Sequence, residues 1–272
     1  MKEYYFLFGL FFVWTLFASI QDLKKREVAN WLNFSLIAFA LTYRLFYSIL
    51  KEDYYFFAYG AMGFAIFFVL AYVFYYAGVF AGGDAKLLMG FGMLLPYSNL
   101  ASFIYLPLIF LFFLFLFGSA YSLVYSIFIV VRNRKRFTKE FSHKVKKYRL
   151  YFTVSVILFV FSLIYSFFNL FGLFLALIFL IFPLYIYTKS LERCMIVLVS
   201  PLNLTEGDWI ERDIKVGRHV VKKTVHGLTL QDIRLLRKNN KKIFVKQGIP
   251  FVPSFLIALI FMGFAFLVSK LA

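Results

Sequence analysis

The sequence predicts an all-α polytopic membrane protein with about eight transmembrane helices and a small mixed α/β cytosolic domain inserted before the last helix. Apolar residues make up 62% of the 272 residues, and the mean hydropathy is +0.81. Soluble domains are only about 45–50% apolar. The apolar residues also form uncharged runs of about 20, each long enough to cross a hydrocarbon core of roughly 30 Å. This composition excludes a soluble globule, a disordered chain and a disulfide scaffold.

Basic residues gather in the connections between the apolar runs. The formal net charge is +17, and most Lys and Arg lie in segments 24–26, 132–149 and 189–246. Cytoplasmic loops beside anionic head groups have this pattern, so we expect membrane lipids as partners and no nucleic acid. Four cations fall at outer or membrane-embedded positions: Lys2, Arg44, Lys51 and Lys270.

The first expected spans follow the chain in order. Run 4–20 is a retained first helix, because its basic flank follows the run and no small-residue cleavage site comes after it. Runs 31–50 and 54–79 are the next two spans. The stretch 87–131 must cross twice to keep its basic flank cytoplasmic, with a turn at 96–102. Its first crossing is too short for a full bilayer, which requires thinned lipid or a shielded helix end.

The second half contains a hairpin, a polar segment and a last span. The hairpin comprises 150–168 and 171–187, and the last span is 250–271. Within the polar segment, 218–224 is typical of a strand, and Thr229 with Asp232 has the spacing of a helix-start box. Both termini are expected outside. The predicted division is a bundle at 1–187, a cytosolic domain at 188–248 and a final helix at 249–272.

Two acidic residues are candidates for chemistry. Asp22 ends the first span and Asp84 follows the third, at the same expected depth and on the same side. A carboxylate near the bilayer is costly unless it is solvated or partnered. Two neighbouring carboxyls share a proton, so one can activate water while the other polarises a peptide carbonyl. Gly82 and Gly83 would let an extended substrate backbone approach. The residues alone equally allow two solvated acids at helix ends.

Two motifs resemble a known family. The segment from Asp22 to Asn30 resembles the first-aspartate motif of type IV prepilin and archaeal preflagellin peptidases. The segment from Ala81 to Leu87 resembles their second motif, the GxGD motif of intramembrane aspartyl proteases, with Ala81 in place of its first glycine. The resemblance implies that Asp22 and Asp84 are the catalytic dyad. Segment 247–255 is similar to the C-terminal region of the archaeal branch.

The resemblance implies an endopeptidase at the cytoplasmic face of the cell membrane. Its expected partners are archaellin- or pilin-like precursors, from which it removes the leader. Bacterial bifunctional members also N-methylate their product and hold zinc with two CxxC pairs. Cys194 is the single cysteine here, so we expect a peptidase without methyltransferase activity. Three dispersed histidines, including His226, add no metal site, and we expect neither a metal nor a cofactor.

Other motif residues are candidates for support of the dyad. Lys86 is placed to orient substrate or lower an aspartate pKa, or is simply an interface cation. Arg26 and Asn30 follow Asp22 in the motif, where a loop cation and a helix cap are the alternatives. A different class of function also remains: a proton- or cation-coupled transporter, or a pilus-assembly scaffold, that uses the paired acids. A transporter would be expected to have acids at the midplane and internal repeats, and the sequence shows neither.

Overall fold

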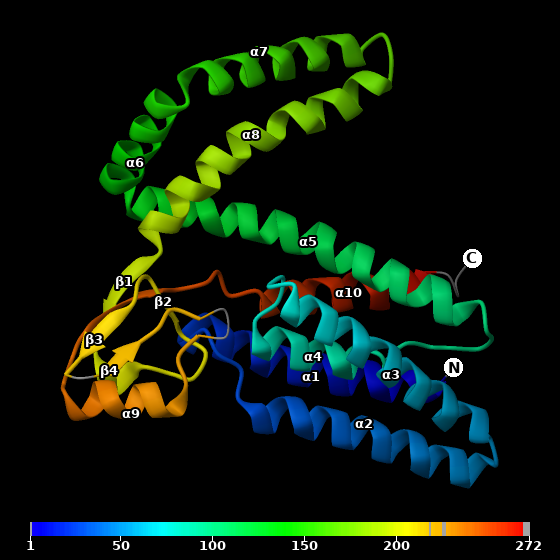
Figure 1. Cartoon of the computed structure of the whole chain (residues 1–272). Helices are drawn as coiled ribbons and strands as arrows, with labels where there is room; N and C mark the ends of the chain where they lie inside the picture. Colours follow the sequence, from blue (N-terminus) through cyan, green and yellow to red (C-terminus); the bar gives the residue numbers. More distant parts are fainter. Residues whose placement is uncertain (1, 218, 225–226, 269–272) are drawn as a thin grey trace. The chain divides into compact units, whose positions relative to one another are not determined.

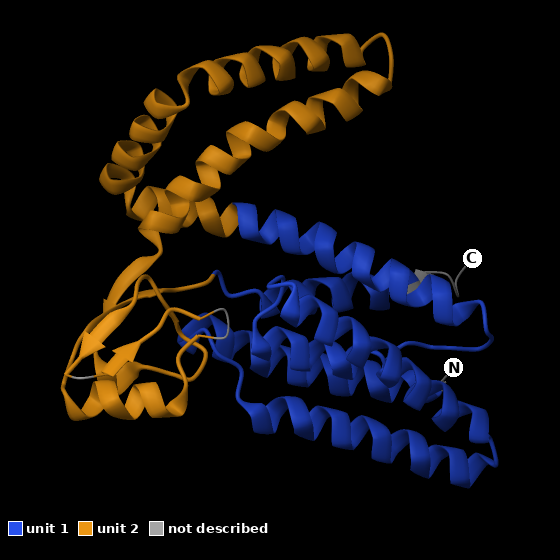
Figure 2. Ribbon diagram, viewed as in Figure 1, with its two compact units in different colours: residues 1–123, 249–272 blue, residues 124–248 orange. Residues whose placement is uncertain are grey.

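The computed structural model describes residues 2–217, 219–224 and 227–268 (Figure 1). The described chain is mostly helical, with two small sheets near the C-terminus. It divides into two compact units, one of residues 1–123 with 249–272 and the other of residues 124–248 (Figure 2). Expectations that involved Arg218, His226 and Lys270 lie outside the described residues.

The first unit is a bundle of helices. The helices α1, α2 and α3 follow one another along the chain, and α4 packs against both α2 and α3. The last helix, α10, packs against α1, the first. The bounds are α1 Lys2–Lys25, α2 Asn30–Lys51, α3 Tyr54–Tyr76, α4 Gly82–Phe91, α5 Ser102–Arg132, which continues into the second unit, and α10 Val252–Val268.

Aromatic side chains fill the centre of this bundle. Phe91 of α4 is fully buried, and its ring stacks on Phe110 of α5 with centroids 4.8 Å apart. Phe91 also contacts Phe255 of α10, at 5.5 Å between centroids. Offset aromatic pairs at these distances add to the stabilisation that burial provides. The core therefore encloses α4 among α1, α2, α3, α5 and α10.

The short helix α4 is followed by irregular backbone that a buried arginine stabilises. Arg44 of α2 has no exposed surface. Its Nε donates to the carbonyl of Met93 at 2.7 Å, and its Nη2 donates to that of Leu95 at 3.1 Å. Its Nη1 donates to the carbonyl of Phe56 in α3, also at 2.7 Å. Irregular backbone at membrane depth is tolerated where protein groups satisfy it. Arg44 thus shields the backbone after α4, while the expected crossing and the thinned lipid stay predictions.

The second unit joins a helical hairpin to a small domain. Its first helix, α6 (Arg134–Lys147), is basic and packs against α8 (Phe171–Cys194), as does α7 (Arg149–Ser166). The small domain contains a three-stranded antiparallel sheet in the order β1-β5-β2 and a β3-β4 hairpin. Its elements are β1 Ile196–Val199, the 3₁₀ turn η1 Pro201–Asn203, β2 Trp209–Ile210, β3 Ile214–Val216, β4 His219–Val221, α9 Leu230–Lys238 and β5 Ile243–Lys246.

The predicted helix-start box of the small domain is confirmed. The Thr229 N–H donates to the Asp232 carboxylate at 3.0 Å, and the Asp232 N–H donates to the Thr229 hydroxyl at 3.3 Å. This reciprocal pair satisfies two backbone donors that the first turn of α9 would otherwise leave free. Leu236 of α9 then enters a separate apolar core with Ile210 and Val245 of the sheet.

Among the described residues, six helices are long and apolar enough to cross a membrane. They are α1, α2, α3, α5, α7 and α8. The expected count of about eight spans is not confirmed, because α4 has only ten residues and the described apolar part of α10 is also short. The predicted boundaries at 187 and 248 stay a prediction, since compact packing units do not report position in the bilayer.

Candidate active site

Asp22 and Asp84 lie on different helices of the first unit and interact electrostatically. Asp22 is in the last turn of α1, and its side chain is 6% exposed. Asp84 is in the first turn of α4 and remains partly exposed. The charge of Asp22 acts directly on Asp84. Two carboxyls in this arrangement resist simultaneous ionisation, so their protonation states depend on each other.

The backbone of α10 holds the Asp22 carboxylate. The Val252 N–H donates to Asp22 Oδ2 at 2.9 Å, and the Phe251 backbone also interacts with this carboxylate. Val252 is the first residue of α10. The first N–H groups of a helix have no partner within it, and the helix dipole favours an anion there. The N-terminus of α10 therefore fixes the position of one carboxyl of the pair.

Two side-chain hydrogen bonds join the segments that carry the aspartates. Lys86 Nζ of α4 donates to Asn30 Oδ1, at the start of α2, at 2.6 Å. Asn33, one turn further along α2, donates from Nδ2 to the carbonyl of Gly83 at 3.4 Å. Both bonds connect the stretch after Asp22 with the stretch around Asp84. The structure thus brings together the two motifs that the sequence separates by about 50 residues.

Arg26 ends the first helix of the site. Its φ is +58°, a left-handed conformation that stops α1, and its N–H donates to the Asp22 carbonyl at 2.8 Å. The Arg26 charge also acts on the Asp22 carboxylate. Gln21 Oε1 accepts from the Ala29 N–H at 3.1 Å and so ties the connection between α1 and α2 to α1. Arg26 therefore contributes both a backbone turn and a positive charge beside Asp22.

The two glycines before Asp84 are not required by packing within the chain. A Cβ on Gly82 would lie 3.8 Å from Tyr75 Cε2, and one on Gly83 would lie 3.5 Å from Val28 Cβ. Both are ordinary van der Waals distances. Neither residue has a positive φ. A Cβ at either position would therefore fit against its neighbour without a clash.

Two contributors to this site, the Asn33 side chain and the Val252 backbone, were not predicted from the sequence. Asn33 is 1% exposed, and its Oδ1 has no hydrogen-bond partner among the described residues. Its position one turn after Asn30, on the same face of α2, was the signal available in the sequence. The second contributor is the backbone N–H of Val252. It belongs to segment 247–255, whose only signal in the sequence was its similarity to the C-terminal region of the archaeal branch.

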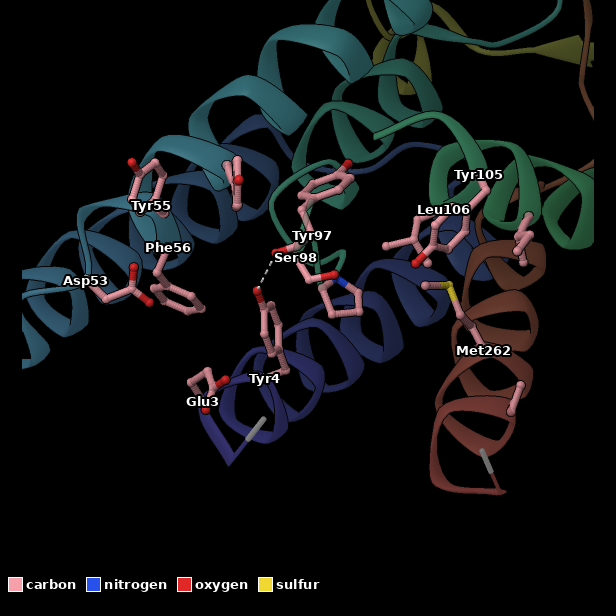
Figure 3. Close-up of a pocket in the computed structure, with 14 residues that line it drawn as sticks. Glu3, Tyr4, Asp53, Tyr55, Phe56, Tyr97, Ser98, Tyr105, Leu106 and Met262 are labelled. Atoms are coloured by element: carbon pink, nitrogen blue, oxygen red, sulfur yellow. Dashed lines mark hydrogen bonds between the residues drawn. The ribbon is translucent and has the colours of Figure 1, made fainter. Parts of the chain in front are cut away.

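A separate cavity of about 810 Å³ lies away from the aspartates (Figure 3). Its lining includes Glu3 and Tyr4 near the start of α1 and Tyr97 in the turn after α4. The Tyr4 hydroxyl donates to the Tyr97 carbonyl at 3.4 Å. Asp22 lies 19 residues further along α1 than Glu3, about 28 Å at 1.5 Å per residue. This cavity is therefore not part of the aspartate site.

Metal ligands do not converge in the described part of the chain. No group of three or more His, Cys, Asp or Glu side chains there is placed to hold an ion. Asp22 and Asp84 are two carboxyls without a third acidic, His or Cys neighbour of that kind. What the pair can do chemically is acid–base work on a water and a polar bond.

Part of the chain is similar to known preflagellin and prepilin peptidases. Residues 9–127 match the model of the type IV leader peptidase family. The chain is 38% identical over 85 residues to a preflagellin peptidase of Methanocaldococcus jannaschii. The matched segment covers 31% of this chain and 36% of that protein. It is 35% identical over 81 residues to a preflagellin peptidase of Methanococcus maripaludis, covering 30% of this chain and 35% of that protein.

A longer match carries a related name. The chain is 27% identical over 155 residues to the prepilin peptidase EppA of Methanothermobacter thermautotrophicus, covering 52% of this chain and 40% of that protein. The matches span well under half the length of each of these relatives. No solved structure matches the chain. The part of the chain that is similar to the type IV leader peptidase family, residues 9–127, holds both Asp22 and Asp84.

Proposed function

We propose that this protein is a membrane aspartic endopeptidase of the GxGD type, which removes the leader from archaellin- or type IV pilin-like precursors. The observation that carries the proposal is the electrostatic interaction between Asp22 and Asp84, whose two motifs are joined by the Asn30–Lys86 hydrogen bond. The names of the relatives, preflagellin and prepilin peptidase, support the substrate class.

The dyad would work with one carboxyl ionised and the other protonated. The ionised carboxylate takes a proton from a water molecule, which then attacks the scissile carbonyl carbon. The protonated carboxyl donates its proton towards the carbonyl oxygen as the tetrahedral intermediate forms. Val252 N–H, which binds Asp22 Oδ2, would hold that carboxyl in place during the reaction. Lys86 and Asn30 would fix α4 relative to α2, and Arg26 would add positive charge beside Asp22.

The precursor would enter beside Gly82 and Gly83. Glycines have no Cβ, so an extended substrate backbone could approach closely there, next to Asp84. The leader precedes the hydrophobic helix of such precursors, so cleavage at the cytoplasmic membrane face separates the two. We assign Asp22 and Asp84 to that face because the basic segments 24–26 and 132–149 mark it.

An eight-span topology follows, with α4 and α10 as the two short crossings. Single cysteines introduced at 132–149 and in the small domain should react with a membrane-impermeant reagent only from the cytoplasmic side. The native Cys194 is buried, and its replacement by Ser provides the background. Labelling of 132–149 from outside would overturn both the span count and the shared face of the aspartates.

The chain is proposed to lack methyltransferase activity. The two CxxC pairs of bifunctional relatives have no counterpart, since Cys194 is the single cysteine. Purified protein incubated with cleaved product and a labelled methyl donor should transfer no label. Methylation of the new N-terminus would contradict this part of the proposal.

The decisive experiment replaces each aspartate with the amide. Asp22→Asn and Asp84→Asn should each lower precursor cleavage by at least about 1,000-fold, because an amide neither accepts nor donates the proton. Asp53→Asn, which changes an exposed acid between α2 and α3, is the matched control and should cleave normally. Near-normal cleavage by either dyad variant would show that the assignment is wrong.

A further inference from the structure

The second unit contains a cavity with a strong excess of positive charge. We call it the basic pocket. It has a volume of about 650 Å³ and is formed by α6, the end of α8, β2, β5 and the segments after β2 and β4. Two carboxylates, Glu192 and Glu211, also line it. The cationic side chains around it are Lys144, Lys189, Arg193, Arg212, Lys223 and Lys246.

Both carboxylates of the basic pocket are already paired. Glu192 lies 3.3 Å from Lys189 Nζ and 3.3 Å from Lys246 Nζ. Glu211 accepts from Arg193 Nη1 at 2.7 Å. One carboxylate is thus shared by two lysines, and the other neutralises a single arginine. The pocket therefore keeps more positive charge than its own acids can balance.

Two cations of the basic pocket have no counter-ion among the residues that the structure describes. The Arg212 and Lys223 side chains are exposed and form no hydrogen bond or ion pair within the part of the chain that the structure describes. Lys144 does have partners: it donates to the Lys189 carbonyl at 2.8 Å and lies 3.7 Å from Glu140. Arg212 and Lys223 are accordingly the donors available to a ligand.

The basic pocket lies at the end of a membrane helix. Lys189 and Arg193 belong to the last two turns of α8, one of the six helices able to span a bilayer. Trp209 also lines the pocket and is 42% exposed. Tryptophan and basic side chains are enriched at the level of the lipid head groups. At the end of a helix that crosses the bilayer, the pocket would lie at the level of the lipid phosphate groups.

We propose that the basic pocket binds the phosphate of an anionic lipid head group. Its volume suits a head group, since ligand pockets are typically about 300–1,000 Å³. The Arg212 guanidinium would donate two parallel hydrogen bonds to phosphate oxygens, and Lys223 would add a point charge. Basic pockets beside membrane helices bind anionic head groups by this chemistry. The proposal does not depend on the peptidase activity proposed above.

Lipid titration of the purified full-length protein tests this site. Detergent-solubilised protein is titrated with phosphatidylglycerol or with phosphatidylcholine of the same acyl chains, and bound lipid is counted by native mass spectrometry. A third arm uses inorganic phosphate as competitor. The test variant is Arg212→Ala with Lys223→Ala, because neither side chain forms a hydrogen bond or ion pair with the other described residues. The control is Lys238→Ala with Lys242→Ala, which removes the same charge from exposed positions outside the pocket.

The parent protein should bind phosphatidylglycerol in preference to phosphatidylcholine. Binding of phosphatidylglycerol should be about ten-fold weaker in the test variant and unchanged in the control variant. Equal losses in test and control variants would overturn the site, because net surface charge would then explain binding. Phosphate binding that depends on Arg212 and Lys223, without any preference for phosphatidylglycerol, would overturn the lipid as the source of the phosphate. A melting temperature of the test variant equal to that of the parent excludes misfolding as the cause of a loss of lipid binding.

Discussion

Asn30 and Lys86 form a bond that joins the two aspartate-bearing segments, and its contribution to cleavage is measurable. Asn30→Ala and Lys86→Ala should each lower kcat/KM about five-fold, a modest value because the bond is exposed to solvent. The double variant should lose no more than either single variant, since both changes remove the same bond. Lys51→Ala, at the other end of α2, is the control. Additive losses would show that the two residues act separately.

Gly82 is proposed to face the substrate, whereas packing requires a glycine at Gly63. Gly82→Ala meets only ordinary contacts and should leave thermal stability unchanged, while it raises KM for the precursor several-fold. Gly63→Ala should instead lower the melting temperature, because its Cβ would overlap the Gly92 carbonyl and the Tyr97 ring. Melting curves and cleavage kinetics in the same detergent compare the two. If Gly82→Ala cleaved with an unchanged KM, the proposed approach of substrate there would be wrong.

At the scale of elements, the short helix α4 depends on Arg44. Arg44→Met should lower the free energy of unfolding in detergent by at least about 3 kcal/mol, because three buried carbonyls lose donors worth about 1–3 kcal/mol each. Arg44→Lys should recover only part of this, since an ammonium cannot match the planar guanidinium. Lys51→Met, an exposed charge on the same helix, should change little. Equal stability of Arg44→Met and the parent would remove the support that we assign to this residue.

For the whole molecule, pH and solubilisation distinguish a protease from a transporter. Cleavage that needs one ionised and one protonated carboxyl should follow a bell-shaped pH profile that belongs to the Asp22–Asp84 pair. The rate should fall at low pH, where both protonate, and at high pH, where both ionise. Cleavage should persist in detergent and with a chelator present, because the dyad requires neither a gradient nor a metal. Ion flux in sealed vesicles without any proteolysis would favour the transporter instead.

The sequence by itself determined the membrane class, the long spans and the two aspartates. Hydrophobic runs and basic loops are local properties, so α1, α2, α3, α5, α7 and α8 could be located from residue order alone. The helix-start box at Thr229 is equally local and was predicted correctly. Asp22 and Asp84 stood out because a carboxylate near a bilayer is costly without a partner or water.

Only the tertiary structure decided which residues meet at the aspartates. The Asp22 carboxylate binds the Val252 N–H 230 positions away, and no pattern along the chain specifies that contact. Asn33 reads as an ordinary polar residue of a helix until it is placed against the Gly83 carbonyl. The sequence placed Arg44 only as a cation at an outer or membrane-embedded position, and the structure shows that it is fully buried and bonded to three carbonyls. The physical reason is that buried polar groups must find partners wherever packing brings donors and acceptors together.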